Sequence, residues 1–140
     1  MKILAVDLGV ARTGLAICDE TETLASPLTT ICERRDEPRL DKVAQIALES
    51  GAGLIVVGHP KNMDGTCGES AQRAERFAKA LAEQTGLPVT LWDERLTTVS
   101  AIGYLNETDT RGKKRKAVVD TVAATIILQN YLDSRHRNGG

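Results

Sequence analysis

The stretch that most constrains the fold runs from Lys2 to Gly14, near the start of the chain. Four apolar residues, Ile3 to Val6, precede a carboxylate, Asp7, and two glycines and an arginine follow. A short, wholly apolar run is typical of a strand that is buried on both faces. An ionised carboxylate at the end of such a strand is costly unless something pairs with it. Because ligands collect at the carboxyl ends of parallel strands, Asp7 is either a turn residue or the first member of a functional site.

The length and charge of the chain indicate one domain with a core of ordinary size. It has 140 residues, of which 41% are hydrophobic, and 18 basic and 19 acidic side chains give a net charge of −1. This balance argues against non-specific coating of nucleic acid, so any nucleic-acid contact must come from a local patch. We expect a single domain over residues 1–134 and a frayed tail over residues 135–140.

The cysteines and histidines give little indication of thiol or zinc chemistry. The three cysteines form no C-x-x-C pair, so neither a disulfide framework nor a zinc site is expected, and Cys67 is best interpreted as an incidental free thiol. With two histidines in the chain, a Cys-His nucleophilic dyad has weak support. No apolar run is long enough for a membrane span, and the amino terminus lacks a signal-peptide pattern. We therefore expect a cytoplasmic protein that does not bind membranes.

Predicted strands and helices follow one another in an order typical of an α/β fold with a mixed sheet. The predicted strands cover residues 3–6, 15–18, 24–32, 54–58 and 89–92. The predicted helices cover residues 36–51, 66–86 and 97–105, and a last helix follows the basic run 113–116 and continues to about Leu132. Short connections favour an antiparallel meander for the first three strands, with Pro27 at an edge. A helical crossover then makes the fourth strand parallel to the first.

Carboxylates recur where the predicted strands end. Asp93 and Glu94 follow the last strand, as Asp7 follows the first. The last helix adds Asp120, which shares one helix face with Ala123, Ala124 and Ile127. An inward-facing carboxylate on that face needs a cation beside it.

Two kinds of cation satisfy this requirement. The first is a salt bridge to Arg12 or Arg95. The second is Mg²⁺ or Mn²⁺, because several carboxylates without convergent histidine or cysteine suit a hard divalent ion. One or two such ions would lower the pKa of an attacking water and neutralise the leaving oxygen of a phosphodiester. That chemistry needs no catalytic histidine.

Four motifs occur in order along almost the whole chain. They are Asp7-x-Gly9-x-x-Arg12-x-Gly14, Pro60-x-Asn62-Met63-Asp64-Gly65, Asp93-Glu94-Arg95-Leu96-Thr97-Thr98 and Lys116-x-x-x-Asp120-x-x-Ala123-Ala124. Together they resemble the YqgF family of RuvX-like proteins, over about Ile3 to Leu132. The resemblance implies a ribonuclease H-like fold with a five-stranded mixed sheet flanked by helices. It also implies that Asp7, Glu94 and Asp120 are the catalytic acids and the ligands of Mg²⁺ or Mn²⁺.

The resemblance further implies an endonuclease that matures the 5′ end of precursor 16S ribosomal RNA. By fold analogy the same family is described as a Holliday-junction resolvase, and the sequence does not choose between the two substrates. The implied partner is structured nucleic acid, RNA in preference to DNA junctions, together with pre-ribosomal particles. An alternative of another class is a catalytically weak, RNA-binding ribosome-assembly factor.

The residues expected to contact nucleic acid are basic or polar neighbours of the three acids. They are Arg12, Asn62, Arg95, Lys113, Lys114, Arg115 and Lys116. The basic run 113–116 is expected to be a flexible loop that holds phosphates beside the site.

Overall fold

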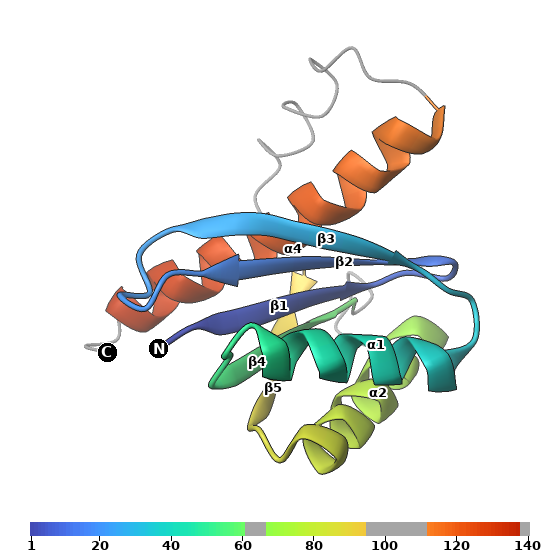
Figure 1. Cartoon of the computed structure of the whole chain (residues 1–140), viewed down its shortest axis with the longest axis horizontal. Coiled ribbons are helices and arrows are strands. Elements are labelled where there is room, and N and C mark those ends of the chain that lie inside the picture. Colours follow the sequence, from blue (N-terminus) through green and yellow to red (C-terminus); the bar gives the residue numbers. More distant parts are fainter. Residues whose placement is uncertain (61–66, 95–111, 138–140) are drawn as a thin grey trace.

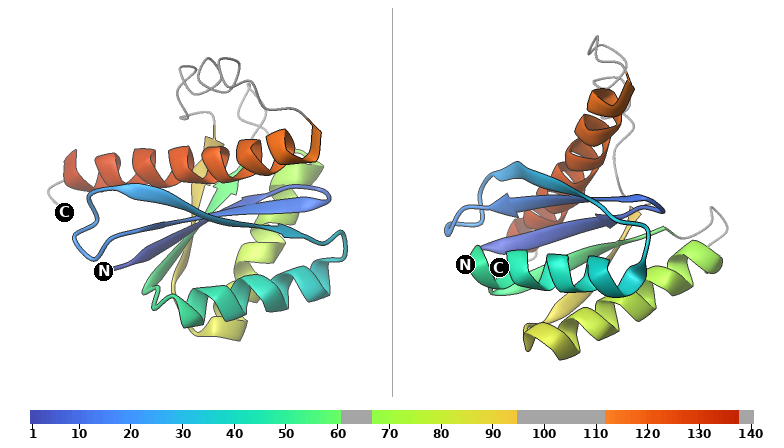
Figure 2. Two further views of the ribbon diagram at one scale, coloured as in Figure 1. Left: turned by 45° about the horizontal axis from the view of Figure 1, so that its top comes forward. Right: turned by 45° about the vertical axis from the view of Figure 1, so that its right-hand side comes forward.

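The structure, a computed structural model, describes residues 1–60, 67–94 and 112–137, and for 112–120 and 137 it describes the backbone only. Three layers make up the described part. A central sheet carries helices α1 (Asp36–Glu49) and α2 (Glu69–Thr85) on one face and the long helix α4 (Gly112–Arg137) on the other (Figures 1 and 2). The helix predicted over residues 97–105 lies outside the described residues.

The sheet has five strands in the order β3-β2-β1-β4-β5. The bounds are β1 (Ile3–Leu8), β2 (Arg12–Cys18), β3 (Ala25–Cys32), β4 (Leu54–His59) and β5 (Val89–Asp93). β1, β2 and β3 form an antiparallel meander, whereas β4 and β5 continue parallel to β1. Pro27 lies in the edge strand β3, where the pairing with β2 shifts beside Ala16. The predicted five-stranded mixed sheet with flanking helices is confirmed.

Alternation along the strands separates two hydrophobic cores. Leu4 and Val6 of β1 belong to the core beneath α1 and α2, whereas Ile3 and Ala5 belong to the core beneath α4. The same alternation holds along β4. Because successive side chains of a strand point to opposite faces, Asp7 lies on the α4 face of the sheet.

Helix α4 is longer at both ends than the sequence pattern predicted. The basic run 113–116 lies in its first turns, so the prediction of a flexible loop there is wrong; lysine and arginine are good helix formers, and no proline interrupts the run. At the other end the helix continues to Arg137, so residues 135–137 are helical and not a frayed tail. The Arg135 side chain donates a 2.8 Å hydrogen bond to Glu22, and a 2.7 Å hydrogen bond joins the His136 ring to the Glu22 backbone oxygen. These contacts hold the end of the helix on the β2–β3 turn.

Candidate active site

Two of the three predicted acids meet at the carboxyl ends of the parallel strands. Asp7 lies in β1 and Glu94 directly follows β5, and their side chains share a hydrogen bond. β4 lies between these two strands, so the two carboxyls approach each other across the end of β4. Both residues are half-buried. The fold therefore brings together two acids that are 87 residues apart in the sequence.

Gly58 of β4 makes the space that Glu94 occupies. A Cβ atom at this position would lie 3.0 Å from Glu94 Oε1 and 3.0 Å from Cδ1 of Ile127 in α4. Both distances are shorter than ordinary carbon contacts, so a side chain at position 58 would displace one of the two neighbours. The Glu94 carboxyl consequently lies over the backbone of β4 and close to α4.

Aromatic packing fixes α4 beside this acid. Trp92, two residues before Glu94, meets Tyr131 of α4 edge to face, with ring centroids 5.8 Å apart. Ala124, Ile127 and Leu128 of the helix are buried against the same face of the sheet. This packing limits how far the end of β5 can move from the helix.

The surroundings of Glu94 favour its protonated form more than water does. Burial raises the pKa of Glu94 above its ordinary value, and the negative charge of Asp93 adds to the rise, whereas the hydrogen bond with Asp7 and the charge of His59 lower it. A hydrogen bond between two carboxyl groups requires that one of them be protonated. A cation at this point would replace the shared proton and relieve the repulsion between the two charges.

Asp120 lies in the backbone-only part of α4, seven residues before Ile127 and hence close to two helical turns from it. Its side chain lies outside the described residues. Its place in the acidic triad therefore stays a prediction.

The residues predicted to bind nucleic acid fall into three groups. Arg12 is described: it is the first residue of β2 and half-buried, and its carbonyl oxygen accepts a 3.0 Å hydrogen bond from the Gly9 amide. Asn62 and Arg95 lie outside the described residues. Of Lys113, Lys114, Arg115 and Lys116 the structure describes the backbone, at the start of α4.

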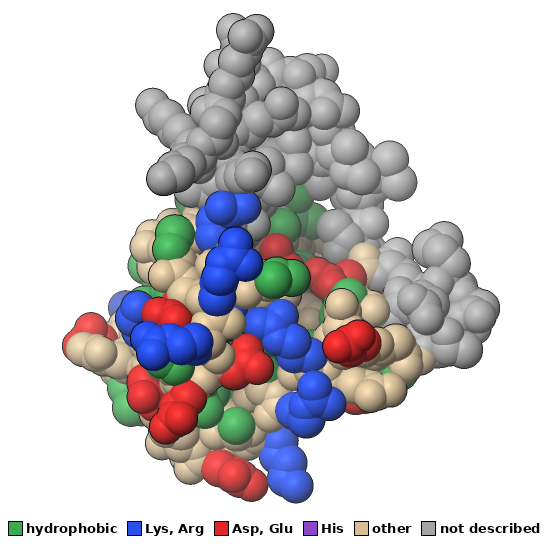
Figure 3. Space-filling model, turned by 90° about the vertical axis from the view of Figure 1, so that its right-hand side faces the viewer, with side chains coloured by type: hydrophobic (Ala, Val, Ile, Leu, Met, Phe, Trp, Pro, Cys, Tyr) green, Lys and Arg blue, Asp and Glu red, His purple; other side chains and the backbone are tan. Residues whose placement is uncertain are grey.

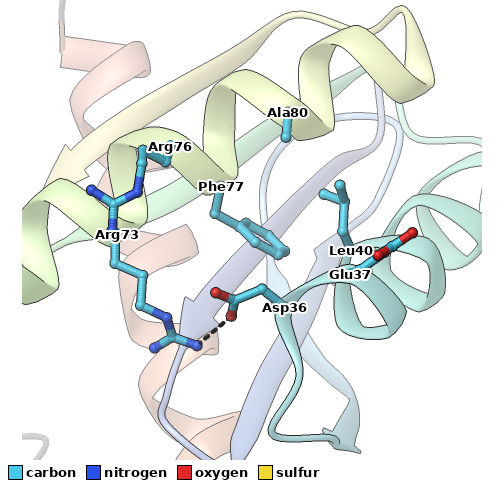
Figure 4. Close-up of a pocket in the computed structure, with 7 residues that line it drawn as sticks. All are labelled: Asp36, Glu37, Leu40, Arg73, Arg76, Phe77 and Ala80. Carbon is cyan, nitrogen blue, oxygen red and sulfur yellow. Dashed lines mark hydrogen bonds and ion pairs between the residues drawn. The ribbon is translucent and has the colours of Figure 1, made fainter.

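Two arginines that the sequence analysis missed hold the turn after Asp7. Arg39 is wholly buried and donates hydrogen bonds to the carbonyl oxygens of Gly9, Val10 and Glu33. Arg73 donates a 3.0 Å hydrogen bond to the same Gly9 oxygen and pairs with Asp36 at 3.1 Å (Figure 4). The helical spacing of α1 could have indicated that Arg39 is buried, because it places this residue on the same face as Val43, Ala44 and Ala47.

Positive and negative side chains alternate over the edge of the sheet where this turn lies. Figure 3 shows this edge face on, with lysine and arginine side chains interspersed among aspartates and glutamates. A groove of about 410 Å³ there is lined by Val10, Arg34, Asp36, Glu69, Ser70 and Arg73. A second cavity, of about 280 Å³, lies between α1 and α2, with Phe77 and Leu40 at its base and charged residues at its mouth (Figure 4). The described part of this edge is thus mixed in charge and not uniformly basic.

Comparison with known proteins identifies the family of this chain. A sequence profile for RuvX, described as Holliday junction resolvase, matches residues 1–134. The chain belongs to the RuvX family. It is similar to proteins named "putative pre-16S rRNA nuclease" from Thermoanaerobacter pseudethanolicus, with 46% identity over 96% of this chain and 98% of the relative, and from Lachnospira eligens, with 45% identity over 98% and 100%. The resemblance drawn from the four motifs is confirmed, and with it the prediction of a nuclease, an enzyme that hydrolyses phosphodiesters.

Solved structures of low sequence identity share the fold. Thermus thermophilus RuvC, solved in complex with a Holliday junction substrate, matches with a TM-score of 0.62 at 13% identity, covering 96% of each chain. The fowlpox virus Holliday junction resolvase matches with a TM-score of 0.56 at 15% identity, covering 96% of this chain and 99% of its own. These similarities confirm the ribonuclease H-like fold. In the part of the chain that the structure describes, no helix is both long and apolar enough to cross a bilayer.

Proposed function

We propose that this RuvX chain is a metal-dependent endonuclease whose Asp7, Glu94 and Asp120 hold Mg²⁺ or Mn²⁺ while it cuts structured nucleic acid. The observation that carries the proposal is the pair formed by Asp7 and Glu94, two half-buried carboxyls that share a hydrogen bond over Gly58. A fold that needed these residues only for structure would gain stability by keeping two like charges apart. In this fold, however, the glycine at position 58 leaves room for the Glu94 carboxyl, which lies within hydrogen-bond distance of Asp7.

The donor set fits a hard cation. The Asp7 and Glu94 side chains supply only carboxylate oxygens, which Mg²⁺ and Mn²⁺ prefer. When bound, such an ion activates water and neutralises charge on the leaving oxygen. The chain's own part is to hold Glu94 between β4 and Ile127, to hold the turn after Asp7 through Arg39 and Arg73, and to limit water at the pair by packing α4 on that face.

The substrate proposed first is the 5′ end of precursor 16S ribosomal RNA, in the cytoplasm and within pre-ribosomal particles. The names of the relatives that are 44–46% identical support RNA. The description of the family as Holliday junction resolvase supports four-way DNA as the second candidate. Arg12, Asn62, Arg95 and the basic run 113–116 are proposed to hold the phosphates.

Cleavage of both substrates by one preparation decides between them. Purified protein with Mg²⁺ is given precursor 16S RNA and a four-way DNA junction at equal concentration, and the cut sites are mapped. We expect cuts at the 5′ end of the mature 16S sequence and a lower kcat/KM on the junction. The reverse preference would make the chain a junction resolvase. Tight binding of RNA without cleavage of either substrate, at any concentration of Mg²⁺ or Mn²⁺, would instead support an assembly factor.

A further inference from the structure

A second group of potential metal ligands lies on the other face of the same sheet edge. His59 ends β4, Cys67 lies just before α2, and Glu75 lies in α2. One ligand atom from each, the ring nitrogen, the sulfur and a carboxylate oxygen, can be chosen so that all three lie within 4.8 Å of one another. His59 follows Gly58 directly, so its side chain points away from the face on which Asp7 and Glu94 meet. The sheet separates the two groups.

The histidine of this group has a buried ring nitrogen without a hydrogen bond in the described part of the chain. The residue is only 6% exposed, and its buried Nε2 atom has no hydrogen-bond partner among the described residues. Oε1 of Glu75 lies 3.3 Å from Nε2, close enough for an ion pair but not placed for a hydrogen bond. A buried imidazole nitrogen with no hydrogen bond is costly, because its lost contact with water is not replaced. A cation between Nε2 and the carboxylate would remove that cost.

From this geometry we infer that His59, Cys67 and Glu75 bind a zinc ion. Imidazole, thiolate and carboxylate are the ligands that zinc takes in proteins, and the thiolate argues against Mg²⁺ and Ca²⁺. A tetrahedral zinc ion places a nitrogen and an oxygen ligand about 3.3 Å apart and a nitrogen and a sulfur ligand about 3.6 Å apart, from its ordinary bond lengths. The 3.3 Å separation of Nε2 and Oε1 already matches that geometry.

The other two ligands can move to complete the site. Cys67 is exposed, and the Glu75 side chain is 44% exposed, so modest rotations bring both to the buried histidine. Three protein ligands leave a fourth position for water. The ion would tie the end of β4 to the start of α2. It would not contact the reacting phosphate, because the sheet lies between it and the Asp7–Glu94 pair.

Metal titration of the full chain tests this inference. Chelator-treated protein is titrated with Zn²⁺ against a chromogenic competitor, and with Co²⁺ as a spectroscopic probe whose near-ultraviolet charge-transfer band reports a thiolate ligand. We expect one zinc ion per chain and a thiolate–cobalt band, neither displaced by millimolar Mg²⁺. Cys67→Ser should remove the band and weaken zinc binding by at least about 10-fold, since losing a ligand costs no less than losing a residue that supports one.

Matched variants separate the site from chance binding. Cys32→Ser removes another exposed thiol and Glu83→Gln another exposed carboxylate of α2, and both should bind zinc as the wild type does. His59→Asn and Glu75→Gln should both weaken zinc binding. If His59→Asn fails to fold, Glu75→Gln still tests the site. The inference is overturned if Cys67→Ser binds zinc normally, if Cys32→Ser loses binding equally, or if Asp7→Asn is the substitution that removes the zinc.

Discussion

The two faces of the sheet differ in the chemistry that they bring to the same edge. On the α4 face Asp7 and Glu94 offer only carboxylate oxygens and share a hydrogen bond. On the α2 face His59, Cys67 and Glu75 offer a nitrogen, a sulfur and an oxygen. Adjacent residues of one strand, Gly58 and His59, divide the two groups. The alternation of a β-strand thus places the proposed hard-cation site and the proposed zinc site on opposite faces of the sheet.

The largest expected effect comes from removing a charge on the α4 face. Asp7→Asn should lower kcat by about 10³-fold or more, since several kcal/mol of charge stabilisation at the reacting phosphate is lost. The variant should be as stable as the wild type or more stable in metal-free buffer, because the repulsion with Glu94 is relieved. Cleavage assays and thermal unfolding measure the two effects. Asp41→Asn, an exposed aspartate of α1, is the control, and wild-type turnover by a folded Asp7→Asn protein would place the chemistry elsewhere.

A methyl group at Gly58 should have the next largest effect on kcat. Gly58→Ala introduces a Cβ 3.0 Å from both Glu94 and Ile127, so the Glu94 carboxyl must move. Displacing a catalytic group by about 1 Å can cost about 10²-fold in rate. We expect kcat to fall by about 10- to 100-fold, and overpacking to lower the free energy of unfolding by about 1–3 kcal/mol.

Gly53→Ala is a matched control for this substitution. Its Cβ would also lie 3.0 Å from a neighbour, but that neighbour is the flexible side chain of Met1. Met1 and Gly53 precede β1 and β4, at the end of these strands opposite the site. Full activity in both variants would show that the space above Gly58 does not matter for catalysis. Zinc binding on the other face should survive in both.

The pH dependence of stability should differ between the wild type and Glu94→Gln. Burial raises the pKa of Glu94 in the folded state, so the folded chain holds this proton more tightly than the unfolded chain does. In metal-free buffer the free energy of unfolding should therefore fall as the pH rises from about 4.3, the ordinary glutamate pKa, through the raised value. Glu94→Gln should lack this fall, whereas Glu83→Gln should keep it. Parallel curves for all three proteins, from denaturant unfolding at each pH, would contradict the description of the pair.

The smallest expected effect is on stability, and it concerns the contact between Glu22 and Arg135 near the end of α4. Burial alone would raise the pKa of Glu22, but hydrogen bonds from the N-terminal ammonium and Arg135 outweigh it and lower the pKa below its ordinary value. The stabilisation from Glu22 is thus present above about pH 4.3 and is lost as the pH falls through the lowered pKa. Glu22→Gln should cost about 1 kcal/mol or less at pH 7, because ion pairs whose side chains are still partly exposed contribute little.

Denaturant unfolding of Glu22→Gln beside Glu20→Gln, an exposed neighbour in the same turn, measures this difference. Equal stability of the two variants would show that the Arg135 contact does not hold the helix. Zinc binding on the α2 face should be unchanged in both variants.

The strands, and with them Asp7, could be predicted because an apolar run that ends in a carboxylate has few structural outcomes. The residue pattern made Glu94 and Asp120 candidates, and the resemblance of their motifs assigned both to the acidic triad. The structure adds for Glu94 the hydrogen bond to Asp7. The role of Gly58 could not be predicted, since it depends on a distance between β4, the end of β5 and α4. The grouping of His59, Cys67 and Glu75 could not be predicted either. Eight positions separate each of these residues from the next, and this spacing is not a known metal-ligand motif. The basic run 113–116 was predicted as a loop because it lacks apolar residues, although its residues favour helix.

Anomalous diffraction from crystals soaked with Mn²⁺ and Zn²⁺ together tests most directly whether the two faces hold different ions. Data collected on either side of each absorption edge identify the metal at every peak. We predict manganese at about 2.0–2.3 Å from carboxylate oxygens of Asp7 and Glu94, and zinc bound by His59, Cys67 and Glu75. Manganese absent from Asp7 and Glu94, or carboxylates too far apart for one or two ions to bridge, would contradict the proposed active site. Zinc absent from the α2 face would contradict the division of the sheet into two metal-binding faces.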